Sequence, residues 1–295
     1  MSKRLRIGVV GTGHWAQVVH ANGAADHPGV ELVGVWGRDL RRAGALADRH
    51  HVPAYDDFDA LLDRVDLLTF AIPPQVQAGL AVRAAEAGKH LLLEKPIALD
   101  VAAADQLVGA AERSGISTVV FFTQRFVPVW ETWLQEVVAG APAGGRADWM
   151  TSHVAPDSPY AGSVWRREHG ALWDVGPHSL SQLLPALGPV TGVAGARGEG
   201  DLVHLVLTHA GGRTSRMSLS MTLPDGISRI DVEFYGDGGF VQQPDHTRDV
   251  PDAYARALSE LLAMIEAGET RHRCDVRFGR DVVEVLSRCE DVLDH

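Results

Sequence analysis

The chain has 295 residues, 45% of them hydrophobic, and a formal net charge of −11. This length and composition support two domains with full cores, and the acidic balance argues against a nucleic-acid-binding surface. No stretch of eighteen apolar residues predicts a membrane span, and the first ten residues lead straight into a strand instead of a signal peptide. We therefore expect a cytoplasmic protein without a membrane partner.

Strand and helix patterns alternate through the first ~120 residues, as a doubly wound parallel sheet requires. We predict strands at residues 6–10, 30–36, 65–71, 90–94 and 117–122. The helices between them are expected to begin near residue 16 and to cover about 40–49, 75–87 and 99–113. Asp39 stands where it can cap the second of these helices. The elements predict an N-terminal Rossmann domain of α/β class, residues 1–122.

In the second half of the chain the pattern changes to a period of two, seen at residues 217–223 and 230–234. Such alternation is typical of an antiparallel sheet with one side toward solvent. Amphipathic helices are expected at 253–267 and 281–293. We therefore predict a C-terminal α+β domain, residues 123–295, with an open, mainly antiparallel sheet and a last helix able to pack back near the first domain.

The stretch at 11–16 reads Gly-Thr-Gly-His-Trp-Ala and directly follows the first predicted strand. Gly11 allows a tight turn, Gly13 lets a pyrophosphate approach the backbone, and Ala16 lets the following helix pack closely on the strand. Because strand, turn and helix come in the required order, we predict a dinucleotide-binding turn. The residues assigned to it are Gly11, Thr12, Gly13, His14, Trp15 and Ala16.

Cofactor choice depends on the end of the second strand, where an acidic residue would bind the ribose 2′-hydroxyl of NAD. The sequence there is Trp36-Gly37-Arg38, with a guanidinium instead of a carboxylate. A guanidinium suits a 2′-phosphate and can stack on adenine, whereas Asp39 is expected to serve as a helix cap. We therefore favour NADP, with NAD as the alternative. Trp36 either flanks the adenine or is a buried residue of the strand end.

The tripeptide Glu94-Lys95-Pro96 closes an apolar run at 90–93. A lysine at the carboxyl end of a buried parallel strand points into the crevice where open α/β sheets bind their ligands. We expect the nicotinamide ring to lie there. The alternative for Lys95 is a solvated lysine at a strand end.

In the second domain, Asp174 and His178 have a spacing of four, which would place both side chains on one helical face, where an acid and a base can share a substrate hydroxyl. Histidine titrates near neutral pH, as reversible proton transfer requires. The alternative makes Asp174 a helix N-cap and His178 a hydrogen-bonded core residue.

Just upstream of Asp174, Trp165-Arg166 is a candidate substrate contact, since Arg166 can bind an anionic or hydroxyl-rich ligand. Most tryptophans of this domain are expected in the core.

Taken together, these motifs resemble the Gfo/Idh/MocA oxidoreductases. The resemblance rests on the glycine turn, on residues 85–90 leading into Glu94-Lys95-Pro96, on Gln124-Arg125-Phe126, and on residues 170–178. It implies a Rossmann domain joined to a C-terminal α/β domain with an open antiparallel sheet. Three features depart from the family pattern: Gln77 in place of a histidine, His169-Gly170-Ala171 in place of a triple glycine, and Ser181 in place of an aspartate.

The resemblance implies roles for three residues. Lys95 would polarise or position the reacting oxygen, His178 would be the acid/base, and Asp174 would orient the substrate or the histidine. The further residues that we assign to the cofactor are Ile72, Pro73, Pro74, Gln77, Glu94, Lys95, Gln124 and Arg125. We expect no metal site, because Cys274 and Cys289 share no ligand spacing and the histidines do not cluster.

Three functions compete at this point. The leading hypothesis is an NADP-dependent oxidoreductase that acts on a carbonyl or secondary alcohol of a sugar or cyclic polyol. The second is reduction of an imine or another C=X bond in secondary metabolism, and the third is a catalytically silent, nucleotide-sensing regulator. The resemblance also implies a homo-oligomer, most simply a dimer formed through the open face of the second sheet.

Overall fold

The computed structural model describes residues 4–152, 158, 160, 162–247 and 249–294. The chain divides into two compact units. Unit 1 comprises Met1–Phe126 and Asp249–Arg280, and unit 2 comprises Val127–Arg248 and Asp281–His295. The sequence pattern assigns the segment Asp249–Arg280 to the second domain, whereas the fold groups it with unit 1. Hydrophobic periodicity shows that a helix has an apolar stripe but does not reveal which core buries that stripe.

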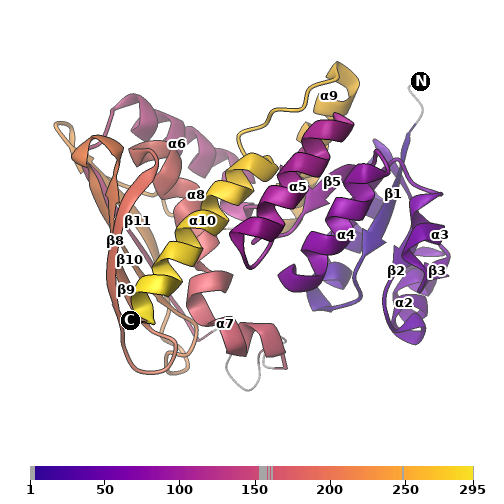
Figure 1. The fold of residues 1–295 in the computed structure, drawn as a ribbon, viewed down its shortest axis with the longest axis horizontal. Coiled ribbons are helices and arrows are strands. Elements are labelled where there is room, and N and C mark those ends of the chain that lie inside the picture. Colours follow the sequence, from indigo (N-terminus) through magenta and orange to yellow (C-terminus); the bar gives the residue numbers. More distant parts are fainter. Residues whose placement is uncertain (1–3, 153–157, 159, 161, 248, 295) are drawn as a thin grey trace. The chain divides into compact units, whose positions relative to one another are not determined.

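Unit 1 is built on a six-stranded parallel sheet in the order β3-β2-β1-β4-β5-β6 (Figure 1). Its strands are β1 (Leu5–Val10), β2 (Val30–Trp36), β3 (Ala54–Tyr55), β4 (Leu67–Phe70), β5 (His90–Leu93) and β6 (Thr118–Val120). β4 is buried along its whole length, as a strand covered on both faces must be. The direction of winding reverses between β1 and β4, so their carboxyl ends flank the point where open α/β sheets bind ligands.

Helices cover both faces of this sheet. They are the π-helix η1 (Ala16–Ala21), α1 (Asn22–Asp26), α2 (Leu40–Ala47), α3 (Phe58–Leu62), α4 (Pro74–Glu86), α5 (Val101–Ser114) and α9 (Val250–Ala267). Right-handed crossovers put α1 and α2 on one face and α4 and α5, side by side in Figure 1, on the other. α9 contacts α1, β5 and β6 and so extends the layer of α1. The carboxylates of Asp39, Asp57, Asp100 and Asp249 accept backbone N–H groups and fix where α2, α3, α5 and α9 begin.

Unit 2 holds a second six-stranded sheet, in the order β12-β11-β7-β10-β9-β8. Its strands are β7 (Gly144–Met150), β8 (Val190–Arg197), β9 (Val203–His209), β10 (Thr214–Ser220), β11 (Arg229–Gly236) and β12 (Gly239–Gln242). Neighbouring strands are antiparallel except β7 and β10, which are parallel. The predicted mainly antiparallel sheet is confirmed. Its one parallel pair escapes sequence reasoning, because side chains alternate with the same period in both kinds of strand.

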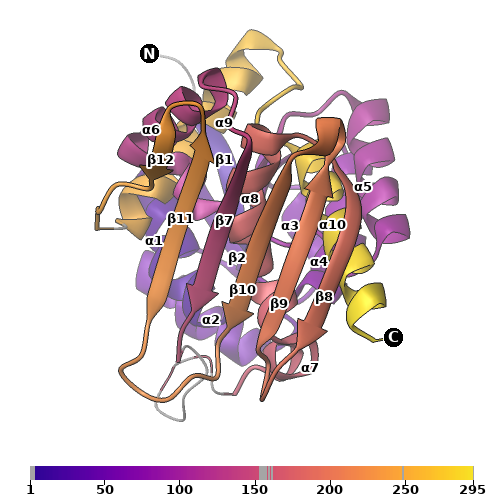
Figure 2. The same cartoon turned by 90° about the vertical axis from the view of Figure 1, so that its left-hand side faces the viewer.

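Helices cover one face of this second sheet, and Figure 2 shows the other face with no helix in front of the strands. The covering helices are α6 (Pro128–Ala139), α7 (Val164–Asp174) and α8 (Gly176–Leu187). α8 packs on β7 and β10, and α6 packs on α8. α10 (Val276–Leu293) begins earlier than expected and crosses from unit 1 to unit 2 after Arg280. Trp149, Leu219 and Phe234 point to the covered face and are buried.

Candidate active site

Several predicted cofactor motifs stand at the carboxyl ends of adjacent strands of unit 1. The glycine turn follows β1, Gly37-Arg38 follows β2, the Ile72-Pro73-Pro74 segment follows β4, and Glu94-Lys95 follows β5. These four strands are neighbours in the sheet. Because they are parallel, their carboxyl ends share one edge, and this edge is the expected place for a nucleotide.

The glycine turn has the local geometry of a phosphate cradle. Gly11 has φ +134°, and a Cβ there would overlap the carbonyl oxygen of Ala71, so only glycine fits. A Cβ on Gly13, by contrast, would meet nothing within 4 Å, which leaves its backbone open to a ligand. Glycine is therefore needed at position 11 because the backbone packs closely there. At position 13 it leaves room for a ligand to approach the backbone.

The chain after the turn forms the π-helix η1 instead of the expected α-helix. Its first residue, Ala16, is fully buried against the sheet, as the dinucleotide motif requires. The backbone N–H of Gln17 donates to the carbonyl oxygen of Gly13 at 3.0 Å and closes the turn. π-Helical segments are rare and often lie at functional sites, and residue composition does not reveal them.

At the end of β2, Asp39 caps α2 as the sequence predicts. The Asp39 carboxylate accepts the backbone N–H groups of Arg41 and Arg42 at 3.0 and 3.3 Å, and these hydrogen bonds, the one from Arg42 first, lower the pKa of Asp39. The side chain of Arg38 is exposed. Trp36 is buried and its indole nitrogen donates to the carbonyl oxygen of Asp56 at 2.9 Å, which matches its interpretation as a strand-end core residue.

Lys95 leaves the end of β5 through a turn that several side chains hold. The side-chain amide of Gln77 accepts the backbone N–H of Glu94 at 3.1 Å and donates to the carbonyl oxygens of Glu94 and Pro96 at 2.7 and 3.2 Å. The peptide bond between Lys95 and Pro96 is cis. Gln77 is fully buried, so its amide fixes the backbone beside Lys95 from within the fold.

Gln124 and Arg125 lie in the short helix η3 (Thr123–Phe126) that follows β6. Both side chains are buried. The carbonyl oxygen of Arg125 accepts a hydrogen bond from Arg273 at 3.0 Å, which ties η3 to the segment after α9. Because η3 follows β6, and β6 is the neighbour of β5 in the sheet, Gln124 and Arg125 lie at the same sheet edge as Lys95.

The structure corrects the argument that places Asp174 and His178 on one helix. Asp174 is the last residue of α7, and His178 lies in the first turn of α8. Gly170 causes an earlier break, because its φ of +61° and ψ of −162° interrupt the helical path within α7. Val175 stands at the junction and caps neither helix with its side chain. Asp174 is therefore not a helix N-cap either.

Asp174 and its neighbour Arg166 form an ion pair. The Nε of Arg166 donates to Oδ2 of Asp174 at 2.7 Å, and the Asp174 side chain is 4% exposed. The guanidinium also lies over the rings of Tyr160 and Trp165, 4.5 and 4.9 Å from their centroids. Trp165 itself is buried.

His178 is buried and stacks on Trp149, with ring centroids 4.7 Å apart and planes 16° from parallel. Sequence reasoning expected most tryptophans of this domain in the core and did not connect Trp149 with His178. The expectation that most tryptophans of this half are core residues is confirmed, since Trp130, Trp133, Trp149, Trp165 and Trp173 are all buried.

Three polar residues of unit 1 also escaped sequence reasoning. His20, Thr69 and Tyr254 are fully buried and form hydrogen bonds that lead to Glu94. For His20 a signal exists in the sequence, because it is a titratable residue inside the apolar stretch Val18-Val19-His20-Ala21. Thr69 and Tyr254 carry no such signal.

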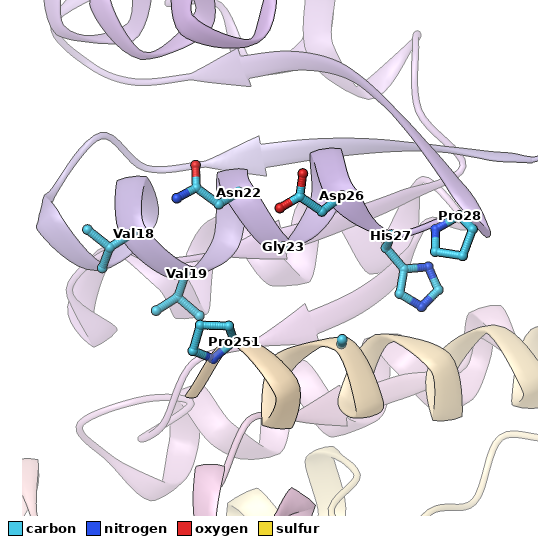
Figure 3. A pocket seen from close by; sticks show the side chains of 9 residues that line it. Val18, Val19, Asn22, Gly23, Asp26, His27, Pro28 and Pro251 are labelled. Atoms are coloured by element: carbon cyan, nitrogen blue, oxygen red, sulfur yellow. The ribbon is translucent and has the colours of Figure 1, made fainter. Parts of the chain in front are cut away.

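A surface groove of about 300 Å³ lies between η1–α1 and the start of α9 in unit 1 (Figure 3). Its walls come from residues 18–28 and from Pro251 and Ala255. It contains none of the strand-end motifs, so we do not assign it to the cofactor. Among the described residues, no group of three His, Cys, Asp or Glu side chains is arranged to hold a metal ion, and no helix is long and apolar enough to cross a membrane.

A parallel Rossmann sheet with a glycine turn at its switch point, followed in the chain by an open mixed sheet, defines a two-domain dinucleotide-binding protein. Residues 5–122 match a family model described as "Oxidoreductase family, NAD-binding Rossmann fold". The match identifies residues 5–122 as a Rossmann domain of the Gfo/Idh/MocA type.

Similar proteins include two dehydrogenases whose names give a substrate. Inositol 2-dehydrogenase of Rubrobacter xylanophilus is 29% identical over 252 residues, which cover 82% of this chain and 72% of the relative. UDP-N-acetylglucosamine 3-dehydrogenase of Acidithiobacillus ferrooxidans is 27% identical over 234 residues, 77% of this chain and 71% of the relative. Among solved structures, GenD2 from gentamicin A biosynthesis, in complex with NAD, has a TM-score of 0.86 at 22% identity and covers 100% of this chain and 95% of its own.

Proposed function

We propose that the chain is an NADP-dependent oxidoreductase that transfers a hydride between the nicotinamide and a carbonyl or secondary alcohol of a sugar or cyclic polyol. The observation that carries this proposal is the position of Lys95, which follows β5 at the same sheet edge as the glycine turn. The names of two relatives, an inositol and a UDP-sugar dehydrogenase, support a ring alcohol as the substrate class. Unit 1 would bind the cofactor, and unit 2 would supply most of the substrate contacts.

The residues of unit 1 fit a dinucleotide. Gly13 leaves its backbone open to a pyrophosphate, and Arg38 offers an exposed guanidinium to a 2′-phosphate. Asp39 is a poor partner for a ribose 2′-hydroxyl, because its carboxylate already accepts two backbone N–H groups of α2. These observations favour NADP. NAD remains the second candidate, since the similar structure GenD2 holds NAD.

The bound nicotinamide would supply or accept the hydride. In the direction of oxidation, His178 would take the proton of the reacting hydroxyl, and it would return the proton in the direction of reduction. Lys95 would hold its ammonium group at the same oxygen and stabilise the negative charge that develops there. Asp174, paired with Arg166, would orient the substrate.

The experiment is a panel of sugars, cyclic polyols and their ketones, each assayed with NADPH or NADP and with NADH or NAD. Transfer of deuterium from labelled NADPH to a ring carbon is the expected result. Transfer to an imine carbon with none to carbonyls would support the alternative of a C=X reductase. Cofactor binding without any hydride transfer across the panel would support the nucleotide-sensing alternative and contradict the proposal.

We also propose that the chain forms a dimer through the face of the unit 2 sheet that α6, α7 and α8 leave uncovered, which we call the bare face. This face carries a connected set of charges: Arg146 lies 2.9, 2.7 and 3.0 Å from carboxylate oxygens of Asp148, Asp231 and Glu233. Paired charges of this kind can be buried at lower cost than single ones. Val206 and Phe240 add exposed apolar surface to the same face.

A further inference from the structure

Unit 1 contains a line of buried polar side chains behind the turn that carries Lys95. His20 on η1 has its Nε2 3.0 Å from Oε1 of Glu94 and its Nδ1 2.7 Å from the hydroxyl of Thr69 on β4. The hydroxyl of Tyr254 on α9 donates to the Thr69 oxygen at 3.0 Å. Residues that lie far apart in the sequence therefore meet in one hydrogen-bonded line that ends at Glu94.

One tautomer of His20 satisfies every member of this line. Burial raises the pKa of Tyr254, so its hydroxyl keeps its proton and donates it to Thr69. Thr69 then has its own single proton to donate to Nδ1 of His20. The ring proton of His20 is therefore on Nε2, from which it is donated to Glu94.

The Glu94 carboxylate accepts the hydrogen bond from His20 and two further hydrogen bonds. The indole nitrogen of Trp15 donates to Oε1 at 2.6 Å, and the backbone N–H of Lys95 donates to Oε2 at 3.2 Å. An indole N–H and a peptide N–H can only donate, so both oxygens of Glu94 act as acceptors. The carboxylate thus connects His20 and Trp15 on one oxygen with the backbone of Lys95 on the other.

The His20 ring packs against an aromatic residue of α9. Its imidazole meets the phenol ring of Tyr254 edge-on, with centroids 4.9 Å apart. Tyr254 in turn lies against Gly23 of α1, where a Cβ would overlap the phenol ring. Glycine at position 23, in spite of its cost within a helix, is therefore what lets Tyr254 of α9 reach Thr69.

We propose that His20 is a positioning residue for Lys95. It holds the Glu94 carboxylate through Nε2–H, and Glu94 holds the backbone N–H of Lys95, so the lysine leaves the strand end in one direction. Without this donor, Oε1 of Glu94 keeps only the Trp15 indole, so the carboxylate is held less firmly and the orientation of Lys95 is less well defined. The consequence for catalysis rests on the proposed function, whereas the ordering of Lys95 does not.

Two substitutions that each keep one half of the histidine test the proposal. In His20→Gln the amide nitrogen reaches the place of Nε2 and keeps the donor to Glu94. In His20→Asn the shorter amide reaches only the place of Nδ1, and His20→Leu removes both groups. We expect kcat/KM to fall about 10- to 100-fold in the Asn and Leu variants, mainly through kcat, and to recover largely in the Gln variant. Equal losses in the Gln and Asn variants, in step with melting temperature, would overturn the proposal.

Lys95 can also be observed without turnover, because the chain has only two other lysines, Lys3 and Lys89. In protein with ¹³C-labelled lysine, two distinct ε-proton shifts mark a fixed Lys95 side chain, and one averaged shift marks a mobile one. We expect distinct shifts in the wild type and in His20→Gln, and an averaged shift in His20→Asn and His20→Leu. An averaged shift in the wild type, or distinct shifts in the Leu variant, would contradict the proposal.

His209→Gln is the matched control for these measurements. His209 is also buried and bonded at both ring nitrogens, to the carbonyl oxygen of Gly188 at 2.7 Å and to Ser215 at 2.8 Å, but it lies in unit 2. This variant should lower the melting temperature and leave the Lys95 shifts unchanged; altered shifts would mean that they report general destabilisation. If the wild type transfers no hydride to any substrate, the proposed function fails, while the Lys95 shifts still decide the role of His20.

Discussion

Arg166 and Asp174 form a partly buried ion pair, in which Nε of the arginine donates to the carboxylate at 2.7 Å. The pair joins two residues that the sequence assigns separately, Arg166 to substrate contact and Asp174 to orientation. The Asp174 side chain is 4% exposed and the Arg166 side chain 20% exposed, so water screens their interaction only in part. The two should therefore affect a substrate as one unit.

A double-mutant cycle on Arg166→Ala and Asp174→Asn should show this coupling. Each single change should raise KM more than it lowers kcat, and the combined effect should differ from the sum by about 0.5–3 kcal/mol. Arg167→Ala removes the same charge from the exposed neighbour on α7 and serves as the control. Strict additivity in kcat/KM would show that the pair does not act as a unit.

Lys95→Met and His178→Ala should each lower kcat and kcat/KM together, by roughly 10²–10⁴, while NADPH affinity stays nearly unchanged. A parallel fall of kcat and kcat/KM is expected for groups that act on the reacting oxygen only in the transition state. Lys89→Met is the control for lysine loss. Lys89 precedes β5, at the end opposite Lys95, and its Nζ donates to the carbonyl oxygen of Val65. Full single-turnover hydride transfer in folded His178→Ala would remove His178 from the mechanism.

NADPH should bind more tightly than NADH, and Arg38→Ala should narrow the difference. Loss of a charge-assisted contact with the 2′-phosphate is worth roughly 1.5–3 kcal/mol. Arg41→Ala is the control, because its guanidinium lies 3.7 Å from the Asp39 carboxylate. Fluorescence titrations that give equal affinity for the two nucleotides would refute the NADP preference.

The protein should have the mass of a dimer in light scattering. Asp148 is almost fully buried on the bare sheet face and lies 2.9 Å from Arg146 and 3.1 Å from Arg216. Reversing the charge of Arg216 with Arg216→Glu should weaken the dimer, because it adds a negative charge beside Asp148 on the face that the two copies would share. A concentration-independent monomer mass in the wild type would exclude this interface.

Acid should remove a stabilising contribution of Glu260. Burial alone would raise the pKa of its carboxyl, but hydrogen bonds from His272 and Arg273 outweigh burial and hold the pKa at about 2. A carboxyl with a lowered folded-state pKa stabilises fully above its unfolded value of 4.5, and this stabilisation is lost as the pH falls toward 2.

The melting temperature should therefore decrease more steeply between pH 5 and about 2 in the wild type than in Glu260→Gln. Glu266→Gln, at an exposed position of the same helix, should keep the wild-type pH dependence. Parallel melting curves for the wild type and Glu260→Gln over this range would contradict the assignment.

Much of unit 1 was predictable because it depends on neighbours in the sequence. The alternation of apolar strands and capped helices predicts the parallel sheet, and β2 was placed at its observed bounds. The glycine turn could be located because Gly11 and Gly13 meet requirements of the local backbone. The cap of α2 by Asp39 is likewise a matter of a few consecutive residues.

The sequence by itself determined the Rossmann sheet, the glycine turn and the strand end that presents Lys95, because hydrophobic period and backbone sterics act over short distances. Only the tertiary structure decided which core buries α9, that Asp174 and His178 belong to two helices, and that His20 meets Glu94 across 74 residues of chain. A sequence pattern specifies which face of an element is apolar or polar. The packing of the whole unit determines which element covers that face, and buried polar groups such as His20 find hydrogen-bond partners there that are distant in the sequence.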